Sequence, residues 1–222
     1  MKLIYYLFLG LAFFSCNQEN ICPSEIEIGA FKLLEASKAA FPYTPTDSVF
    51  VFKNIQGEEY RFRAVNKAHT IIGLGSRKEA CNTEGDTIIY KFTTQSKSID
   101  FWHDSLNLGF TVDLYTLVNQ EELEKKEVAD VLYILEREPF FDNSFPVALH
   151  VVLDQRNHGP FYFAAPSFAE EKTLGLRTFH QVYWDEDFGP WRKYILYYNN
   201  EFGLIGIENP QNDFLLWFDR KE

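Results

Sequence analysis

The stretch Tyr194–Phe218, YILYYNNEFGLIGIENPQNDFLLWF, carries the clearest structural pattern in the chain. Apolar and aromatic runs alternate with turn-forming residues at short intervals, which is typical of strands joined by tight turns. The pattern predicts strands at Arg192–Tyr198, Gly203–Glu208 and Asp213–Asp219. Turns are expected at Asn199–Phe202 and Asn209–Asn212. Because these turns are short, the three strands should form an antiparallel meander.

The same rhythm continues toward the amino terminus. It predicts strands at Ser48–Lys53, Glu58–Asn66, His69–Leu74, Asp86–Thr94, Ser98–His103, Leu108–Val118, Phe145–Asp154, Phe161–Ala165 and Leu176–Trp184. Polar loops are expected at Arg77–Gly85 and Pro166–Gly175, and a turn at Gln95–Lys97. Aromatic residues make up 17% of the chain, and their preference for pleated surfaces favours strands.

One segment near the amino terminus carries a helical pattern. Ser24 and Glu27 have the spacing of a capping box, and the apolar residues beyond them predict a short helix over Glu25–Ala40. The alternation of Ile26 and Ile28 leaves a strand open as the alternative for this segment.

A second helix is expected from Gln120 to about Arg137. Asn119 is a suitable N-cap, and acidic residues cluster in the first turn, where the helix dipole favours them. Pro139 would end the helix. Together these patterns predict a mainly β fold: an antiparallel meander, built as a sandwich or a curved half-barrel, with one or two short helices.

The amino terminus, MKLIYYLFLGLAFFSC, has the form of an export signal. Lys2 precedes a twelve-residue apolar core, Leu3–Phe14. A membrane-spanning helix needs about 20 apolar residues, so this core is too short to span a bilayer and has the length of a signal-peptide core.

The end of this core, Phe13-Phe14-Ser15-Cys16, resembles the lipobox of Gram-negative bacterial lipoproteins. The resemblance implies a diacylglycerol on Cys16, removal of residues 1–15 and acylation of the new amino terminus. It also implies that the membrane is a partner, reached through the lipid anchor, and that the protein lies in the cell envelope. The alternative is an ordinary secretory signal followed by a coincidental cysteine.

The Tyr194–Phe218 stretch resembles the carboxy-terminal hairpins of uncharacterised all-β lipoproteins of the Gram-negative envelope. That group offers no known catalytic residues to transfer. We therefore expect a signal peptide at residues 1–15, a lipidated tether with a short helix at 16–46, and a single antiparallel β domain at 47–222.

The chain has three cysteines. With Cys16 committed to lipid, Cys22 and Cys81 remain, and in an oxidising envelope a remaining pair predicts a disulfide. Two cysteines this far apart, without a Cys-x-x-Cys motif or paired histidines, argue against a zinc site, so no metal or cofactor is expected.

The formal net charge of −11 limits the classes of partner. An acidic chain without a basic patch cannot neutralise many phosphates, which argues against nucleic acid. The same charge argues against electrostatic attachment to anionic lipid.

The sequence contains no recognisable catalytic motif, neither a Gly-x-Ser-x-Gly elbow nor a phosphate-binding loop, which favours a protein that is not an enzyme. One stretch is a candidate ligand surface. Asp185, Glu186 and Asp187 lie between Trp184 and Trp191, an arrangement that could grip a sugar or bind Ca²⁺. The alternative is an exposed acidic turn with two tryptophans packed beneath it.

Three functions follow as hypotheses. The first is a lipid-anchored envelope protein that acts as a binding or scaffolding module. The second is a carrier of a lipid or another hydrophobic ligand in a curved β-sheet, and the third is a glycan-binding or glycan-active protein.

Overall fold

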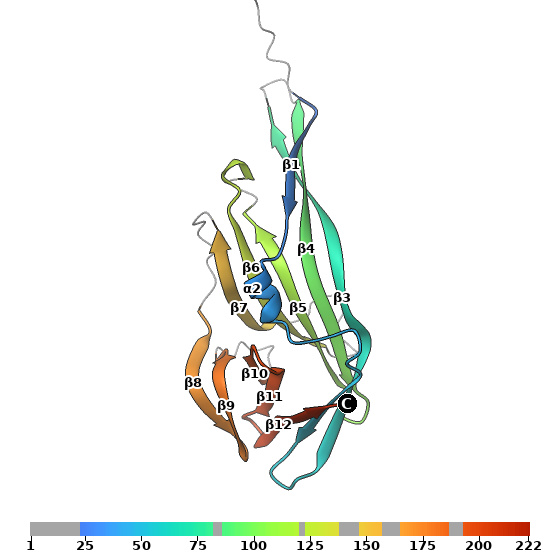
Figure 1. Cartoon of the computed structure of the whole chain (residues 1–222), viewed down its shortest axis with the longest axis vertical. Coiled ribbons are helices and arrows are strands. Elements are labelled where there is room, and N and C mark those ends of the chain that lie inside the picture. The colour runs from blue at the N-terminus through green and yellow to red at the C-terminus, as the bar shows by residue number, and fades with distance from the viewer. Residues whose placement is uncertain (1–22, 82–85, 120–122, 138–146, 157–164, 187–192) are drawn as a thin grey trace, which may run out of the picture. The chain divides into compact units, whose positions relative to one another are not determined.

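The computed structural model describes residues 23–81, 86–119, 123–137, 147–156, 165–186 and 193–222 (Figure 1). These residues belong to two compact units. The smaller unit contains residues 23–27, 76–81 and 86–91. The larger unit contains residues 28–75 and the described residues from 92 to 222.

Strands dominate the described residues. They are β1 (Glu25–Phe31), β2 (Val49–Lys53), β3 (Glu59–Ala80), β4 (Thr87–His103), β5 (Leu108–Val118), β6 (Val128–Arg137), β7 (Val147–Arg156), β8 (Ser167–Leu174), β9 (Arg177–Trp184), β10 (Ile195–Asn199), β11 (Gly203–Asn209) and β12 (Phe214–Lys221). The helical elements are α2 (Glu35–Ala39) and a 3-10 helix, η1 (Leu123–Lys125). No helix among these residues is long and apolar enough to cross a membrane.

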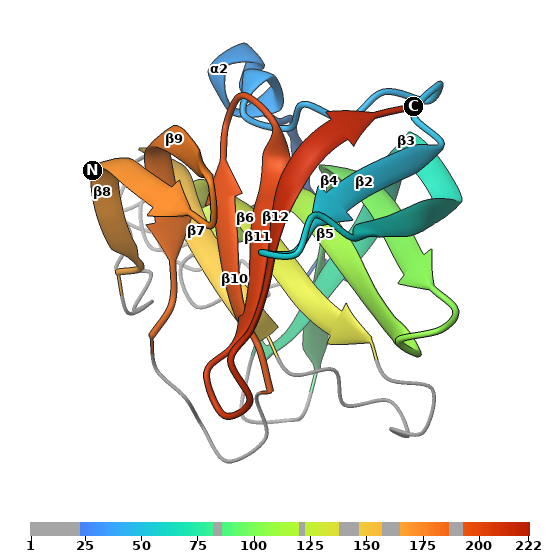
Figure 2. The same cartoon turned by 90° about the horizontal axis from the view of Figure 1, so that it is seen from below.

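The strands hydrogen-bond in the order β7-β6-β5-β4-β3-β2-β12-β11-β10-β9-β8, and β1 pairs with β4 beside this path. In the larger unit this antiparallel sheet curls into a half-barrel (Figure 2). The prediction of a mainly β, antiparallel fold with short helical elements is confirmed, and of its two forms the curved half-barrel is the one observed.

The carboxy-terminal meander forms as predicted. β10 pairs with β11 from Ile195↔Glu208 to Asn199↔Gly203, and β11 pairs with β12 from Gly206↔Trp217 to Asn209↔Phe214. The turns are closed by side chains of asparagine. The Asn199 Oδ1 accepts a hydrogen bond from the Phe202 N–H at 2.9 Å, and the Asn209 Oδ1 accepts one from the Gln211 N–H at 3.0 Å. Both bonds join residues only two or three positions apart, which is why the sequence predicts these turns well.

β12 lies between the strands β2–β7 and the strands β8–β11 in the order of the sheet. Its other neighbour is β2, with Trp217 opposite Lys53 and Lys221 opposite Phe50. β2 in turn pairs with β3, from Val49↔Arg63 to Lys53↔Glu59. The last described strand therefore connects β2–β7 to β8–β11.

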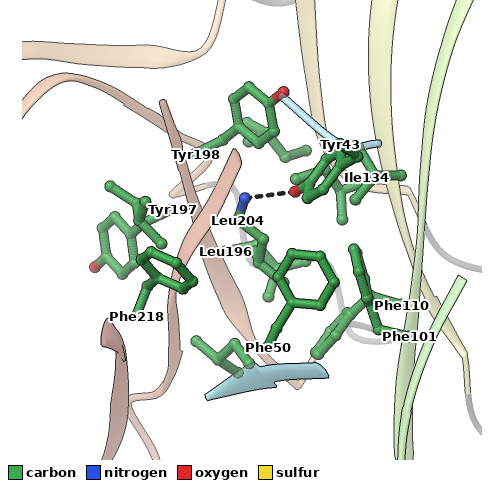
Figure 3. Close-up of a cluster of buried hydrophobic side chains, with 14 of the residues drawn as sticks. Tyr43, Phe50, Phe101, Phe110, Ile134, Leu196, Tyr197, Tyr198, Leu204 and Phe218 are labelled. Atoms are coloured by element: carbon green, nitrogen blue, oxygen red, sulfur yellow. Dashed lines mark hydrogen bonds between the residues drawn. The ribbon is translucent and has the colours of Figure 1, made fainter. Parts of the chain in front are cut away.

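Aromatic side chains fill the core of the larger unit (Figure 3). Phe50 and Phe101 meet edge to face with their ring centroids 4.5 Å apart. The buried Tyr43 accepts a hydrogen bond at 2.7 Å from the Leu204 N–H, and the buried Tyr198 hydroxyl donates to the carbonyl of Ala40. These two bonds attach the segment after α2 to β10 and β11.

A buried carboxylate fixes the segment before α2. Asp130, on β6, accepts hydrogen bonds from the Leu34 N–H at 2.8 Å, from Arg156 at 2.7 Å and from the Thr116 hydroxyl at 3.2 Å. Arg156 also donates to the carbonyl of Lys32 at 3.0 Å. A buried charge is tolerated when it is paired and hydrogen-bonded, and all of these donors converge on Asp130 or on the backbone beside it.

The helix predicted from Gln120 to about Arg137 is wrong. Of this range, residues 123–137 are described, and they form η1 and the strand β6. β6 pairs with β5 from Val128↔Val118 to Arg137↔Gly109 and with β7 on its other side. Its first five residues are all buried, so apolar residues occur on both faces. Such a run contains pairs three and four residues apart and imitates a helical stripe.

The helix predicted over Glu25–Ala40 is also largely wrong. β1 occupies Glu25–Phe31, as the Ile26/Ile28 alternation allowed, and the helix is only Glu35–Ala39. Ser24 is not an N-cap, since its carbonyl accepts a hydrogen bond at 3.0 Å from the Ile89 N–H.

Three predicted interruptions are absent from the described strands. The expected break after Asn66 and the loop from Arg77 as far as Ala80 lie inside β3, and the turn at Gln95–Lys97 lies inside β4. The expected loop at Pro166–Gly175 contains the strand β8. Polar residues and glycines can adopt the strand conformation when a neighbouring strand supplies the hydrogen bonds. The local sequence pattern does not reveal that neighbour.

The smaller unit joins the first described residues to the ends of β3 and β4. Glu25 and Lys91 form an ion pair at 2.6 Å, and the Cys81 N–H donates to the Asp86 carbonyl at 2.8 Å. Cys81 is disulfide-bonded. Cys22 and Cys16 lie outside the described residues, as does the signal peptide, so the pairing of Cys22 with Cys81 stays a prediction.

Candidate functional site

The strands β8, β9, β10 and β11 bring the predicted residue Trp184 into a cluster of aromatic and charged side chains. Ser167 pairs with Trp184, Trp184 pairs with Tyr197, and Tyr197 pairs with Gly206. Residues directly opposite each other share a face of a sheet, so this row places Trp184 beside Tyr197. Their ring centroids lie 6.1 Å apart.

An ammonium group lies over these rings. The Lys172 Nζ is 3.8 Å from the centroid of the Trp184 ring and 5.1 Å from that of Tyr197. Both distances lie within the range of a cation–π interaction, for which tryptophan is the best partner. The cation therefore already occupies one face of the Trp184 indole.

Two carboxylates complete the arrangement. The indole N–H of Trp184 donates to Glu186 Oε1 at 2.6 Å, and the Tyr197 hydroxyl donates to Glu208. Burial, and secondly the bond to Glu208, raise the pKa of Tyr197 well above its ordinary value. We call Lys172, Trp184, Glu186, Tyr197 and Glu208 the Trp184 cluster.

The predicted ligand surface is brought together only in part. Trp184 is half-buried, and Glu186 is exposed and bonded to it. Asp185 is half-buried beside them, whereas Asp187 and Trp191 lie outside the described residues. The described part of the surface has one tryptophan with its N–H and one ring face already engaged.

Sequence reasoning missed Lys172, Tyr197 and Glu208. Lys172 lies in a segment expected to be a loop, and the other two lie in strands whose pattern indicated only the fold. A cross-strand register would have found them, since Tyr197 lies opposite Trp184. That register depends on the pairing of strands and has no local signal.

A second aromatic pair lies at the neighbouring position of the same strands. Phe168 and Tyr183 are directly opposite each other, with ring centroids 5.0 Å apart, and Phe168 is exposed. Because successive residues of a strand point to opposite faces, this pair and Trp184 present aromatic surface on the two sides of the β8–β9 hairpin.

The Trp184 cluster contains the kinds of side chain that protein surfaces use to bind ligands. The Trp184 cluster combines aromatic surface, an ammonium group and carboxylates, which suits the binding of a polar ligand with some apolar surface. Over the described residues, no three histidine, cysteine or acidic side chains gather in a way that could hold a metal ion.

Comparison with protein-family models, with curated proteins and with solved structures finds no match to this chain. Its function is therefore inferred from its own sequence and its own contacts.

Proposed function

We propose that this protein is a lipid-anchored protein of the cell envelope that acts as a binding or scaffolding module. Its anchor would be Cys16, acylated after removal of residues 1–15, and its β-sheet would be held at a membrane surface. A location at the outer membrane, facing either the periplasm or the outside, fits this architecture.

The observation that carries the proposal is the disulfide at Cys81. Disulfides persist in oxidising compartments such as the bacterial periplasm and are rare in the cytosol. The apolar Leu3–Phe14 core followed by Cys16 supports the same destination independently. Several acyl chains at about 0.8 kcal/mol per buried methylene give a stable anchor.

Fractionation of cells expressing the full chain tests this function. We expect the wild-type protein in the membrane pellet and the Cys16→Ser variant in the soluble fraction, with an unchanged far-ultraviolet circular dichroism spectrum. Cys22→Ser is the control: it also removes one cysteine, and with it the predicted disulfide to Cys81, but it keeps Cys16, so the protein should stay in the pellet until detergent releases it. Recovery of the Cys16→Ser protein in the membrane pellet would refute the anchor.

Within this function, the Trp184 cluster is the proposed ligand surface. A glycan is one ligand class that suits it, because sugar rings stack on aromatic faces and sugar hydroxyls bond carboxylates. The sugar would have to displace Lys172 from the Trp184 ring or use the ring's other face. Titration with soluble cell-wall oligosaccharides, followed by tryptophan fluorescence, tests this version: a response lost in Trp184→Leu supports it, and the absence of any response rejects it.

The curled half-barrel supports a second candidate function, the carriage of a lipid or another hydrophobic ligand. Such a ligand would need space beside the aromatic core, in which Phe50, Phe101 and Phe110 are already buried. Native mass spectrometry of the membrane-extracted protein distinguishes the two functions. A non-covalent lipid adduct would favour the carrier, and a mass equal to the protein plus its covalent lipid would leave the binding module.

A further inference from the structure

β3 has one edge beside β4 and one edge that faces away from it, which we call the outer edge. Only part of this outer edge is paired with another described strand. β2 lies along this edge only as far as Arg63, with one further hydrogen bond from the Ala64 N–H to the Ser48 carbonyl. Beyond it, over Thr70–Gly75, β4 is the only strand of the described residues that pairs with β3. In Figure 1, β3 runs alongside β4.

Apolar side chains project from this edge segment. Ile72 is 73% exposed and Leu74 is 89% exposed. Residues two positions apart point to the same face of a strand, so these two side chains form one apolar ridge. Large apolar side chains that protrude together are typical of interaction sites.

The edge segment also lacks the usual protection. Natural edge strands carry charges, prolines or bulges that prevent pairing with another chain. Thr70–Gly75, TIIGLG, has no charged residue and no proline. β8, which ends the sheet path, carries Glu170, Glu171 and Lys172 over a similar length.

We infer that Thr70–Gly75 of β3 is a strand-pairing site for a second copy of this chain. An antiparallel pair centred on Gly73 is self-complementary: it places Ile72 of each copy opposite Leu74 of the other, on one face. Directly opposite side chains in such a pair lie about 4.5–5.5 Å apart, so the four apolar side chains would form one cluster.

The Thr70–Gly75 segment can meet a second copy without adding charge repulsion at the contact. Each chain carries a formal charge of −11, so two copies repel each other over most of their surface. The neutral Thr70–Gly75 segment allows contact without bringing like charges together. A lipid surface would cover Ile72 and Leu74 but would leave the edge N–H and C=O groups without partners, which a paired strand satisfies.

Disulfide cross-linking of the full chain in its membrane tests the pairing. Gly73 lies on the two-fold axis, and directly opposite positions of an antiparallel pair are close enough for a disulfide. We expect Gly73→Cys to produce a reducible band of twice the protein mass on a non-reducing gel. Ile55→Cys, at an exposed apolar position in the turn after β2, is the control and should remain at the mass of one chain.

A second variant separates pairing from chance collision. Adding Leu74→Lys to Gly73→Cys places like charges at the contact and should abolish the double-mass band, while circular dichroism shows that the fold is kept. The inference is overturned if Gly73→Cys forms no more of this band than Ile55→Cys does. It is also overturned if Gly73→Cys is captured in a band of another mass, which would show that a different protein occupies the edge.

Hydrogen–deuterium exchange of the wild-type protein tests the pairing without any substitution. Along Thr70–Gly75, the backbone amides that bond to β4 should exchange with deuterium slowly at any protein density. The amides on the other edge should exchange more slowly as the density of protein in vesicles of zwitterionic lipid rises. Slow exchange of these outer amides at every density would mean that lipid covers the edge, and fast exchange at every density would mean that nothing does. Either result contradicts pairing between copies.

Discussion

Asp130, whose carboxylate has no exposed surface, accepts a hydrogen bond at 2.7 Å from Arg156, whose side chain is about a quarter exposed. The pair is therefore asymmetric. The Asp130 carboxylate has no contact with water and depends on its hydrogen-bond donors, chiefly Arg156, whereas the Arg156 side chain remains in contact with water.

This asymmetry predicts the effect of breaking the pair. Arg156→Met should lower the free energy of unfolding by about 3–5 kcal/mol, because a buried charge then lacks its main partner. Adding Asp130→Asn should restore part of that loss, because the neutral amide removes the buried charge. Urea unfolding of both variants checks this order.

The control for this prediction is an exposed ion pair. Arg61 pairs with Glu59 at 3.2 Å and also with Glu222, and its side chain is half exposed. Arg61→Met should change the free energy of unfolding by about 1 kcal/mol or less. Equal losses in Arg61→Met and Arg156→Met would show that burial of Asp130 has no special consequence.

The hydroxyl of Tyr43 should contribute to stability through one bond. Tyr43→Phe leaves the buried Leu204 N–H without its acceptor, which costs about 1–3 kcal/mol. Tyr60→Phe is the matched control, because the Tyr60 hydroxyl donates to the exposed Glu58 at 3.3 Å and water can replace that contact. Thermal unfolding of the two variants should separate them clearly, and similar midpoints would contradict the prediction.

Buried tyrosines should make the fold sensitive to alkali. Burial raises the pKa of Tyr43 and of Tyr198 well above the ordinary value of 10.0. Above that value the unfolded state loses protons that the folded state keeps, so the free energy of unfolding falls as pH rises. The stability is fully present below about pH 10 and decreases by about 1.4 kcal/mol per pH unit for each such tyrosine.

Urea unfolding at a series of pH values from about 8 to about 11 measures that slope. Tyr43→Phe removes one of the tyrosines whose pKa burial raises and should make the slope shallower. A slope that is unchanged in this variant, or a stability that rises with pH, would contradict the expected direction of the pH dependence.

The Trp184 cluster predicts a measurable coupling. Lys172 lies over the Trp184 ring at 3.8 Å, so the two residues should not contribute independently. A double-mutant cycle with Lys172→Met and Trp184→Leu should give a coupling energy of about 0.5–1 kcal/mol. Additive effects of the two substitutions would show that the ammonium group is not held over the ring in solution.

The turn between β8 and β9 should not tolerate a side chain. Gly175 has a φ of +59°, and a Cβ there would lie 2.0 Å from the Trp217 ring. Gly57 also has a positive φ, +80°, but a Cβ there would meet nothing within 4 Å. Gly57→Ala should therefore cost about 1–2 kcal/mol of stability from backbone strain alone.

Gly175→Ala adds the clash with Trp217 to the same strain, and overpacking of this kind typically costs about 1–3 kcal/mol more. Comparing the two unfolding midpoints isolates the packing contribution. If the two variants are equally stable, the hairpin does not pack against Trp217 as described.

The parts of the fold that the sequence predicts are those whose cause is local. β10, β11 and β12 are bounded by turns in which Asn199 and Asn209 bond their own backbone neighbours, so a short window contains the whole reason for the structure. β5 is bounded correctly, at Leu108–Val118, because its apolar run lies between clear turn residues.

The missed elements have non-local causes. β6 has the apolar spacing of a helix, and only its position between β5 and β7 makes it a strand. The residues of the candidate site also fall into those that are neighbours in sequence and those that strand pairing brings together. Trp184 and Glu186 are neighbours in sequence and could be selected from it, whereas Lys172 reaches them only through the register of β8 with β9.

The position of β12 between β2 and β11 has a consequence for the order in which the chain can fold. Ser48 bonds to Glu222, 174 residues later, so the sheet becomes continuous only after the final described strand has been synthesised. Until then β2 has an open edge, and long-range closure of this kind slows folding. The chain therefore passes through a stage in which its amino-terminal strands present an edge that β12 has not yet covered, and partly folded stages of this kind are prone to aggregation.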